Sequence, residues 1–273
     1  MAKKVDIQGF FSYMGNKADI ADWIIPMFPP HRVYVEVFGG TGAILLNKQK
    51  SEVDCYNDLN TYLSNLFEVV RNPETKKLFL DTLQSHNISQ VTYERFYLNH
   101  EVSSIPDIES AVRYYYIMSL CALGKYNGGF QPSFQDPEVH NMFFRDETKI
   151  NKIHSKIKDI IVFNRPYDKL IKKFTDVEDA LLYLDPPYKN TEDYYKTIVG
   201  DFTVEDHIKL RDLLSKIKGK FIVSYEDHEF IRELYKDYNI YNREKFRPGK
   251  RENAIEIVIT NFKQGNTLFD LST

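Results

Sequence analysis

Residues 33–46 read VYVEVFGGTGAILL and place a β-rich run, a glycine-rich turn and an apolar run in direct succession. Residues 33–37 predict a strand, because valine and tyrosine favour extended backbone. Gly39, Gly40 and Gly42 then allow the backbone to approach a ligand closely where the next helix begins. A strand, a glycine loop and a helix in this order predict a Rossmann-like α/β fold that binds a nucleotide.

The glycine loop does not complete the dinucleotide pattern GxGxxG. A pattern that starts at Gly40 needs glycine where Leu45 stands, and one that starts at Gly39 needs it where Thr41 stands. The loop therefore favours a nucleoside ligand without a pyrophosphate. Glycines that only shape a tight strand-to-helix turn explain the loop equally well.

Two acidic residues flank this loop. Asp58 ends the second predicted strand, residues 53–56, and lies about 20 residues beyond Gly39, the spacing at which a carboxylate reaches a ribose hydroxyl. Its alternative role is that of N-cap for a predicted helix over residues 59–70. Glu36 lies inside the first strand, where it either orients an amine of the ligand or braces the loop.

A second informative stretch, residues 181–188, reads LLYLDPPY. The predicted strand stops at its two prolines, because proline cannot donate to a sheet ladder. Pro187 disfavours helical backbone at Pro186, so the Pro186 carbonyl is expected to stay extended beside the Asp185 carboxylate. These two acceptors suit an NH2 group, and Tyr188 offers a flat face on which a ring can stack. The stretch predicts a site for a planar aromatic amine, with a plain Pro-Pro turn as the alternative.

Composition places the chain among globular proteins of ordinary make-up, with 273 residues, 42% hydrophobic and 27% charged. The net charge of −3 lacks the basic footprint of a nucleic-acid-binding protein, so any such binding must rely on a local patch. Cys55 and Cys121 form no CxxC pair, and the histidines have no metal-ligand spacing, so no metal is expected. The chain has no apolar run that could span a bilayer and no signal region, which predicts a cytoplasmic protein.

Helices and strands alternate until about residue 71 and again after residue 158. Helices are predicted at residues 16–28, 59–70, 74–84, 92–100, 108–123, 204–217 and 228–235, and strands at 33–37, 53–56, 160–163, 181–184, 221–224, near 240, and at 254–260. Residues 72–157 are too many for an ordinary crossover, so they are interpreted as an inserted, mainly helical subdomain. Residues 1–71 and 158–273 then form one catalytic domain.

A polar loop is predicted at residues 124–146, inside the insertion. Asn127-Gly128 is a β-hairpin signal, and Lys125 with Tyr126 precedes it. Amides and a cation are the groups that read base edges, so Lys125, Tyr126 and Asn127 are candidates for DNA contact. An ordinary hairpin in a helical subdomain is nearly as good an interpretation.

Two further segments carry candidate contacts. Residues 243–251 form a basic turn between two strands, and Arg247, Lys250 and Arg251 are candidates for phosphate contact unless the turn is a solvated surface hairpin. Lys17 precedes a helix, where it either pairs with a carboxylate or, as the residue alone suggests, is a solvated first-turn lysine.

Taken together, these motifs resemble the Dam-like DNA adenine-N6 methyltransferases, in which the glycine motif comes first, the target-recognition region second and Asp-Pro-Pro-Tyr last. The resemblance covers most of the chain, and its order and spacing are far more specific than any one motif. The segments that carry it are Tyr13-Met14-Gly15-Asn16-Lys17, Glu36-Val37-Phe38-Gly39-Gly40-Thr41-Gly42, Tyr56-Asn57-Asp58, Tyr126-Asn127-Gly128, Asp185-Pro186-Pro187-Tyr188 and Glu256-Ile257-Val258-Ile259-Thr260-Asn261.

The resemblance implies a site-specific enzyme that transfers a methyl group from S-adenosyl-L-methionine (AdoMet) to the N6 amine of a flipped adenine in double-stranded DNA. The insertion would recognise the target sequence. The residues it implies for AdoMet are Tyr13, Lys17, Glu36, Phe38, Gly39, Gly40, Gly42, Asp58 and Asp185, and for catalysis Asp185, Pro186, Pro187 and Tyr188. The segment after Gly128 departs from the family's longer hairpin, so a GATC target is not carried over.

Double-stranded DNA is therefore the expected partner of a monomer or weak dimer, with no membrane partner, and a cognate restriction endonuclease in a restriction-modification system is left open. Methylation of cytosine N4, or of adenine in RNA, would use the same acceptor groups. A non-catalytic AdoMet-binding regulator and a nicotinamide-dependent oxidoreductase are the alternatives from other classes.

Overall fold

The computed structural model describes residues 6–11, 15–98, 101–102, 104–132, 142–187, 202–245 and 254–264. The helices are η1 (Lys17–Ile20), α1 (Ala21–Ile24), η2 (Ile25–Met27), α2 (Ala43–Asn47), α3 (Thr61–Arg71), α4 (Pro73–Gln84), α5 (Gln90–Leu98), α6 (Ile108–Leu120), η3 (Ala122–Gly124), α7 (Met142–Ile157), α8 (Tyr167–Phe174), α10 (Val204–Leu214) and α11 (Glu229–Leu234). The strands are β1 (Val33–Glu36), β2 (Val53–Asn57), β3 (Ile161–Phe163), β4 (Ala180–Leu184), β5 (Lys220–Glu226), β6 (Asn239–Lys245) and β7 (Ala254–Thr260).

The strands form a seven-stranded sheet in the order β3-β2-β1-β4-β5-β7-β6. β1, β4 and β5 run parallel to one another, whereas β7 is antiparallel to β5 and β6 is antiparallel to β7. The chain order reverses between β1 and β4, which is the point of an open α/β sheet where ligands bind. The predicted Rossmann-like α/β class is confirmed, and every predicted strand is present.

Contacts along the chain group the residues into two compact units. The first unit comprises Met1–Asp22, Gly39–Lys50 and Tyr56–Asn164, and the second comprises Trp23–Phe38, Ser51–Cys55 and Arg165–Thr273. Each unit is thus assembled from segments that are far apart in sequence.

The first unit is built around α6, which packs against α3, α4 and α5. Tyr114, Tyr115 and Tyr116 follow one another in this helix, and all three are fully buried. A helix that buries three successive residues has neighbours on every side, so its pattern is not amphipathic. The aromatic rings of α6 are thus the centre of this core.

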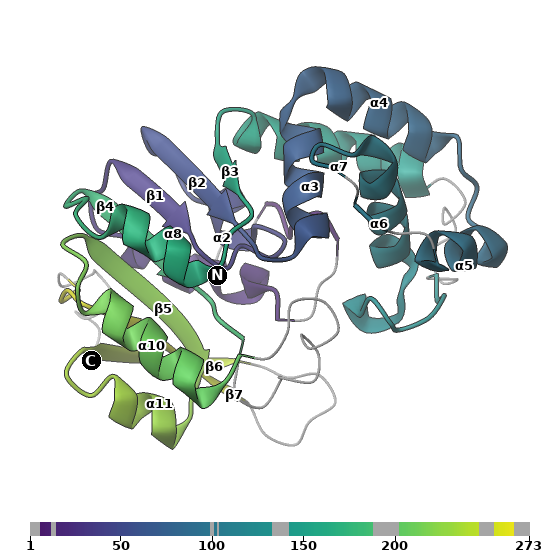
Figure 1. The fold of residues 1–273 in the computed structure, drawn as a ribbon. Coiled ribbons are helices and arrows are strands. Elements are labelled where there is room, and N and C mark those ends of the chain that lie inside the picture. The colour runs from purple at the N-terminus through teal and green to yellow at the C-terminus, as the bar shows by residue number, and fades with distance from the viewer. Residues whose placement is uncertain are drawn as a thin grey trace. The chain divides into compact units, whose positions relative to one another are not determined.

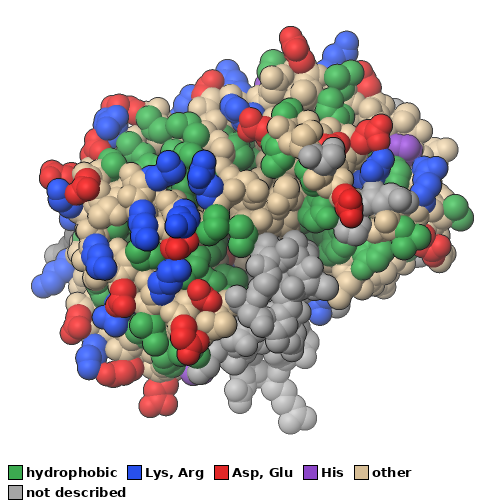
Figure 2. Space-filling view, in the orientation of Figure 1, with side chains coloured by type: hydrophobic (Ala, Val, Ile, Leu, Met, Phe, Trp, Pro, Cys, Tyr) green, Lys and Arg blue, Asp and Glu red, His purple; other side chains and the backbone are tan. Residues whose placement is uncertain are grey.

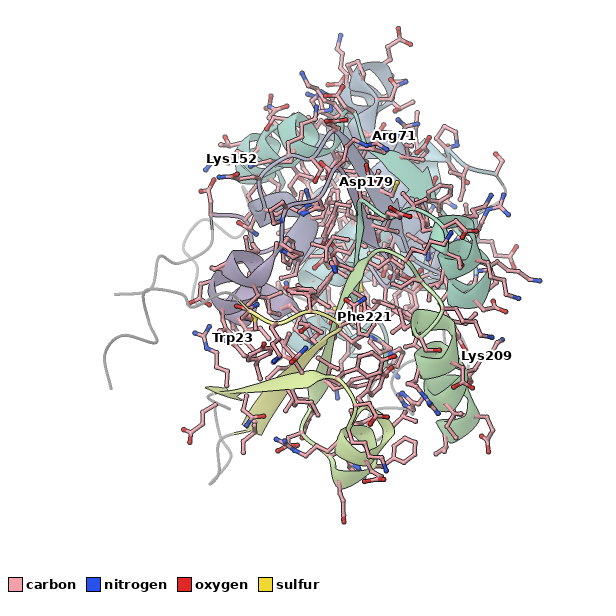
Figure 3. All side chains as sticks on the ribbon, turned by 90° about the vertical axis from the view of Figure 1, so that its left-hand side faces the viewer. Trp23, Arg71, Lys152, Asp179, Lys209 and Phe221 are labelled. Atoms are coloured by element: carbon pink, nitrogen blue, oxygen red, sulfur yellow. The ribbon has the colours of Figure 1, made fainter. Side chains whose placement is uncertain are left out.

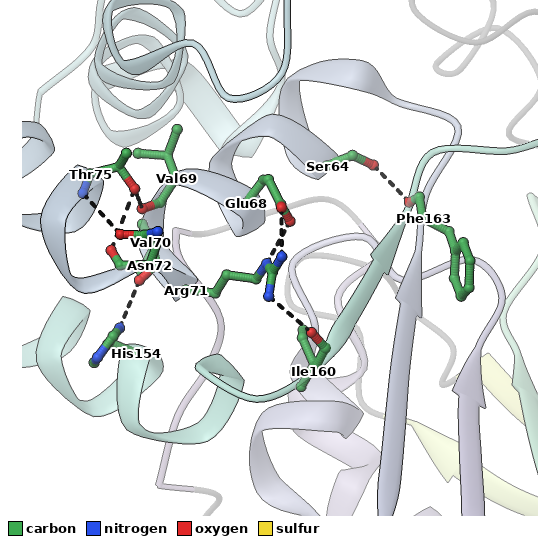
Figure 4. Close-up of polar contacts among 10 residues, drawn as sticks. All are labelled: Ser64, Glu68, Val69, Val70, Arg71, Asn72, Thr75, His154, Ile160 and Phe163. Carbon is green, nitrogen blue, oxygen red and sulfur yellow. Dashed lines mark hydrogen bonds and ion pairs between the residues drawn. The ribbon is translucent and has the colours of Figure 1, made fainter.

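The carboxyl end of α3 is held by groups from later in the chain (Figure 4). Arg71 donates to both carboxylate oxygens of Glu68, at 2.6 and 2.7 Å, and to the Ile160 carbonyl at 3.4 Å. The ring of His154 in α7 donates through Nδ1 to the Val70 carbonyl, at 2.8 Å. His154 thus satisfies a carbonyl that has no partner within the helix and joins α7 to α3, whereas Arg71 ties the end of α3 to the segment between α7 and β3.

The second unit contains the parallel strands next to the reversal. All five residues of β4 are buried, as expected of a strand with both faces covered. Helices α8 and α10 lie side by side over one face of this part of the sheet (Figure 1). Phe221 of β5 lies in the interior, whereas Lys209 of α10 lies at the outer side, where its Nζ is 3.0 Å from Asp168 (Figure 3).

The helical structure departs from the sequence prediction at three places. The loop predicted at residues 124–146 is too long, because α7 begins at Met142 and buries Ile150, Ile153 and Ile157 at helical spacing. Helix α8 was not predicted at all. The helix predicted over residues 16–28 is present from Lys17 to Met27, but as η1, α1 and η2 in succession instead of one α-helix, and Pro26, which has no backbone donor, lies in η2.

No helix within the described ranges is both long enough and apolar enough to cross a membrane.

Candidate active site

In the first unit, the glycine loop is fixed to the end of β2. The Gly39 amide donates to the Asn57 carbonyl at 2.8 Å, and the Tyr56 hydroxyl donates to the Gly40 carbonyl at 2.7 Å. The Gly42 amide closes the turn onto the Gly39 carbonyl at 2.8 Å, just before α2 begins. The loop is therefore held in one conformation before any ligand binds.

The glycines are needed for different reasons. A Cβ at Gly39 would lie only 2.1 Å from a carbon at the edge of the Tyr56 ring, and that ring cannot retreat because it stacks on Phe67 with centroids 3.6 Å apart. Gly40 has a φ of +51°, yet a Cβ there would meet no atom of the described residues within 4 Å. Gly39 thus serves packing, whereas Gly40 presents backbone beside open space, as a ligand-binding loop requires.

The Asp58 carboxylate, just after β2, contacts the glycine loop. One of its oxygens accepts from the Gly40 amide at 2.7 Å, and the other accepts from the Asn60 amide at 2.7 Å. Burial raises the pKa of Asp58 to about 6, although both amide donors act in the opposite direction. Each oxygen keeps a lone pair, so the carboxylate can still accept from a ligand hydroxyl.

The alternative role of Asp58 as a helix cap is excluded. The N-cap of α3 is Asn60, whose side-chain oxygen accepts from the Tyr62 amide at 3.0 Å and from the Leu63 amide at 3.4 Å. Asp and Asn are equally good caps, so local sequence could not decide between them.

Lys17 differs from the solvated lysine that the residue alone suggested. Its side chain is buried, with 5% exposed, and Nζ donates to the Gly15 carbonyl at 3.1 Å. Asn16 is the N-cap of η1, and Lys17 is the first residue of this helix. Tyr13, the other candidate of this segment, lies outside the described residues.

In the second unit, Glu36 and Asp185 stand at the carboxyl ends of adjacent parallel strands. Glu36 is the last residue of β1 and pairs in register with Tyr183 of β4, so Asp185 lies just beyond it on the same edge. Glu36 is buried and accepts from the Tyr34 hydroxyl at 2.8 Å. This edge lies where the strand order reverses, which is the usual position of a ligand in such a sheet.

Asp185 is half-buried, and its Oδ1 accepts from the Ser224 hydroxyl at 3.1 Å. Pro186 is buried and Pro187 is half-buried, so the backbone after β4 is anchored. Tyr188 lies outside the described residues. Ser224 had no signal in the sequence, because it lies on a neighbouring strand.

Phe38 follows β1 and takes part in an aromatic cluster. Its ring centroid is 5.7 Å from that of Tyr167 and 5.8 Å from that of Phe202. The pKa of Tyr167 is raised by burial and by its hydrogen bond to Asp206, so the phenol keeps its proton. The sequence identified Phe38 but not the two rings that fix its position.

The loop that carries Lys125, Tyr126 and Asn127 belongs to the first unit. Among the described residues it is closed by an isolated bridge between Cys121 and Phe130 rather than by a longer ladder. Asn127 is exposed and Lys125 is half-buried.

Tyr126, in contrast, belongs to a stack of tyrosines. Its ring lies 5.1 Å from that of Tyr97 and 6.4 Å from that of Tyr62, with interplanar angles of 28° and 11°. Tyr62 in turn stacks on Tyr114 at 5.2 Å. Tyr126 therefore orders the loop by packing, and Asn127 is the more accessible of the predicted contacts.

Charge is distributed unevenly despite the small net value. The exposed residues Arg165, Lys169, Lys172 and Lys173 gather on and just before α8, and Figure 2 shows basic side chains over this part of the second unit. The net charge of −3 thus conceals a local basic surface. Arg247, Lys250 and Arg251 lie outside the described residues.

No cluster of metal-ligating side chains occurs in the part of the chain that the structure covers.

Comparison with known proteins gives consistent results. The family described as "D12 class N6 adenine-specific DNA methyltransferase" matches residues 13–248. Type II methyltransferase M.CviBI of Paramecium bursaria Chlorella virus NC1A is 27% identical over 246 residues, covering 84% of this chain and 89% of that protein. DNA adenine methylase of Serratia marcescens is 22% identical over 253 residues, covering 86% and 89%. Modification methylase StsI of Streptococcus sanguinis is 23% identical over 297 residues, covering 94% of this chain but 43% of that protein.

Proposed function

Because this chain belongs to the D12 class of N6 adenine-specific DNA methyltransferases, we propose that Asp185 and the Pro186 carbonyl hold the adenine amine that it methylates. The protein is an adenine-specific DNA methyltransferase, and this class implies AdoMet as the methyl donor. DNA adenine is thereby favoured over cytosine N4 and RNA, and the enzyme over the regulator and the oxidoreductase. The observation that carries the proposal is the half-buried Asp185 carboxylate at the edge where the strand order reverses.

The residues of the glycine loop fit a nucleoside with free ribose hydroxyls. Gly40 presents backbone to open space, and the Asp58 carboxylate can accept a hydroxyl that neither amide uses. We assign ribose binding to Asp58, and the shaping of the pocket to Gly39, Gly42 and Phe38. Tyr13, Lys17 and Glu36 complete the proposed set.

AdoMet supplies an electrophilic methyl group bonded to a positively charged sulfur. The difficulty for the protein lies with adenine, because the lone pair of its amine is delocalised into the ring and is a poor nucleophile. Hydrogen bonds from both N–H groups to Asp185 and to the Pro186 carbonyl favour a pyramidal nitrogen and orient its lone pair. The N–H proton becomes acidic only once the nitrogen carries the methyl group, and it then leaves toward Asp185 or water.

The target base must leave the duplex to reach these acceptors, at a cost of about a few kcal/mol in stacking and pairing. We assign the stacking that recovers part of this cost to Tyr188. We also propose that residues 72–157 recognise the DNA sequence through Lys125 and Asn127, and that Arg247, Lys250 and Arg251 contact phosphates.

The test of this function is to incubate the purified protein with unmethylated DNA and AdoMet, and then to locate modified bases by single-molecule sequencing. We expect N6-methyladenine within one recurring sequence context. Methylcytosine, or no modification by a protein that binds AdoMet in calorimetry, would contradict the assignment.

The pKa of Asp58 predicts how AdoMet binding depends on pH. A carboxyl group with a pKa of about 6 in the free protein must be ionised to accept ribose hydroxyls, so binding releases a proton below pH 6. We expect the Kd to rise up to about tenfold per pH unit below pH 6 and to level off above it. Calorimetry in buffers of different ionisation enthalpy measures the released proton.

Asp58→Asn is the control, because it keeps an acceptor but cannot ionise. This variant should bind AdoMet more weakly and without the pH dependence. The stability of the unliganded protein depends on pH in the opposite direction. Because folding raises the pKa of this carboxyl group, the free energy of unfolding falls as the pH rises from about 4 to about 6. A Kd for the unmodified protein that is constant from pH 5 to pH 7.5 would remove Asp58 from the site.

The proposed DNA contacts differ in kind and should give different results. Arg247→Ala should reduce the slope of log K against log salt by about one, because one phosphate contact is lost. Asn127→Ala should leave this slope unchanged and relax the preference for the target sequence. Lys77→Ala removes an exposed lysine of α4 in the same unit and should change neither quantity. If Arg247→Ala and Lys77→Ala gave the same salt slope, the phosphate contact of Arg247 would be contradicted.

A further inference from the structure

A chain of hydroxyl groups leads from the interior of the second unit to Asp185. Ser224 lies on β5, next to Val223, which pairs in register with Leu184. Its Oγ is 3.1 Å from Asp185 Oδ1 and 3.0 Å from the Tyr183 hydroxyl. Ser224 and Tyr183 are both buried, with 0% and 1% exposed.

The direction of this chain follows from the charges around Tyr183. Burial, together with the carboxylates of Asp185, Glu36 and Glu256, raises the pKa of Tyr183 well above its usual value. The phenol therefore stays protonated, and its O–H donates a hydrogen bond to the Ser224 hydroxyl oxygen. The single O–H of Ser224 then donates its hydrogen bond to Asp185 Oδ1. This oxygen is charged, and it is closer than the alternative acceptor, the Leu184 carbonyl at 3.4 Å.

We propose that Ser224 is a positioning residue that fixes the orientation of the Asp185 carboxylate, with Tyr183 holding the Ser224 hydroxyl in turn. The proposal rests on the assignment of Asp185 as the group that holds the target amine. Both positioning groups lie on packed strands of the sheet, so the orientation of the carboxylate is held by rigid elements.

Such rigidity matters because the amine must present its lone pair in line with the methyl group. A displacement of about 1 Å in a group that aligns reactants can lower the rate about 100-fold. A carboxylate that rotates about its own side-chain bonds would place the amine in several orientations, of which few are productive.

The chain cannot also remove the proton of the reaction. A proton that reached Asp185 could pass to Ser224 only if Ser224 gave its own proton onward to Tyr183. Tyr183 already carries a proton and would have to release it into a buried region surrounded by carboxylates. The proton lost by the amine therefore leaves Asp185 toward water, and the chain only orients the carboxylate.

The experiment is a double-variant cycle on the single-turnover rate of DNA methylation, with the Kd for AdoMet and for DNA measured alongside. Ser224→Ala should lower the rate about 10- to 100-fold, with both Kd values within about twofold of the unmodified protein. Tyr183→Phe should lower it less, because Ser224 still donates to Asp185. The double variant should be no slower than Ser224→Ala, since Tyr183 acts through Ser224.

Two further variants separate positioning from packing. Ser224→Thr restores a hydroxyl and should recover most of the rate. Thr260, the last residue of the neighbouring strand β7, carries another fully buried hydroxyl, which donates to the Phe262 carbonyl. Thr260→Val removes this hydroxyl and should leave the rate unchanged. A rate for Ser224→Ala equal to that of the unmodified protein, or losses that multiply in the double variant, would overturn the proposal.

The same assays distinguish the positioning role of Ser224 from the assignment of Asp185 on which it rests. If Asp185→Ala methylates DNA normally, the assignment of Asp185 fails. If Asp185→Ala is inactive while Ser224→Ala is fully active, only the positioning role fails.

Discussion

Asp185→Ala should fold and yet lose at least about 100- to 1,000-fold in the rate of adenine methylation, because the amine loses its charged acceptor. The fold should survive, since Asp185 is half-buried and Ser224 can turn its hydroxyl to the Leu184 carbonyl. The expected cost is about 1 kcal/mol in the free energy of unfolding. Transfer of labelled methyl groups to DNA measures the first effect, and thermal unfolding followed by circular dichroism measures the second.

Asp227→Ala is a matched control. Asp227 follows β5 as Asp185 follows β4, and it is also half-buried, but its carboxylate pairs with Arg232 at 3.0 Å. This variant should keep its methylation rate. A folded Asp185→Ala protein with turnover near that of the unmodified protein would sink the proposed mechanism.

Gly39→Ala should lower the stability of the protein and weaken its binding of AdoMet. The added methyl group would clash with the edge of the Tyr56 ring, which is confined by Phe67 and by its hydrogen bond to the Gly40 carbonyl. Overpacking of this kind costs about 1–3 kcal/mol, and the displaced ring would also release the loop. We expect a lower Tm and weaker AdoMet binding together.

Gly40→Ala separates the two effects. Its methyl group would meet open space, so the cost is limited to the left-handed backbone, about 1–2 kcal/mol. It should weaken AdoMet binding without displacing Tyr56. If Gly39→Ala melted at the same temperature as the unmodified protein, the packing account of this glycine would be wrong.

The strands, the glycine loop and the acidic strand ends could be predicted because each is marked by neighbouring residues. A buried run such as residues 181–184 and a stop at two prolines are local signals. Ser224 has no such signal, since its role depends on the register between β4 and β5. The stacking of Tyr126 on Tyr97 and Tyr62 likewise depends on how helices pack.

Some local signals were present and were misjudged. The lysines of α8 obscured the buried pair Leu170 and Ile171, and the polar residues before α7 obscured its helical spacing. Lys17 was interpreted as solvated because an isolated lysine usually is, although this one is buried. The net charge argued weakly against DNA because a sum over the whole chain cannot reveal where charges gather.

Asp58 contacts the glycine loop, whereas Asn60 caps α3, and this difference has a practical consequence. Asn60 caps α3 by itself, so the side chain at position 58 can be replaced without unfolding the helix that follows. An engineer who wished this enzyme to accept AdoMet analogues altered at the ribose would therefore begin at position 58. Libraries at that position would leave the cap of α3 in place, and replacements that still accept from the Gly40 amide would also keep the glycine loop fixed.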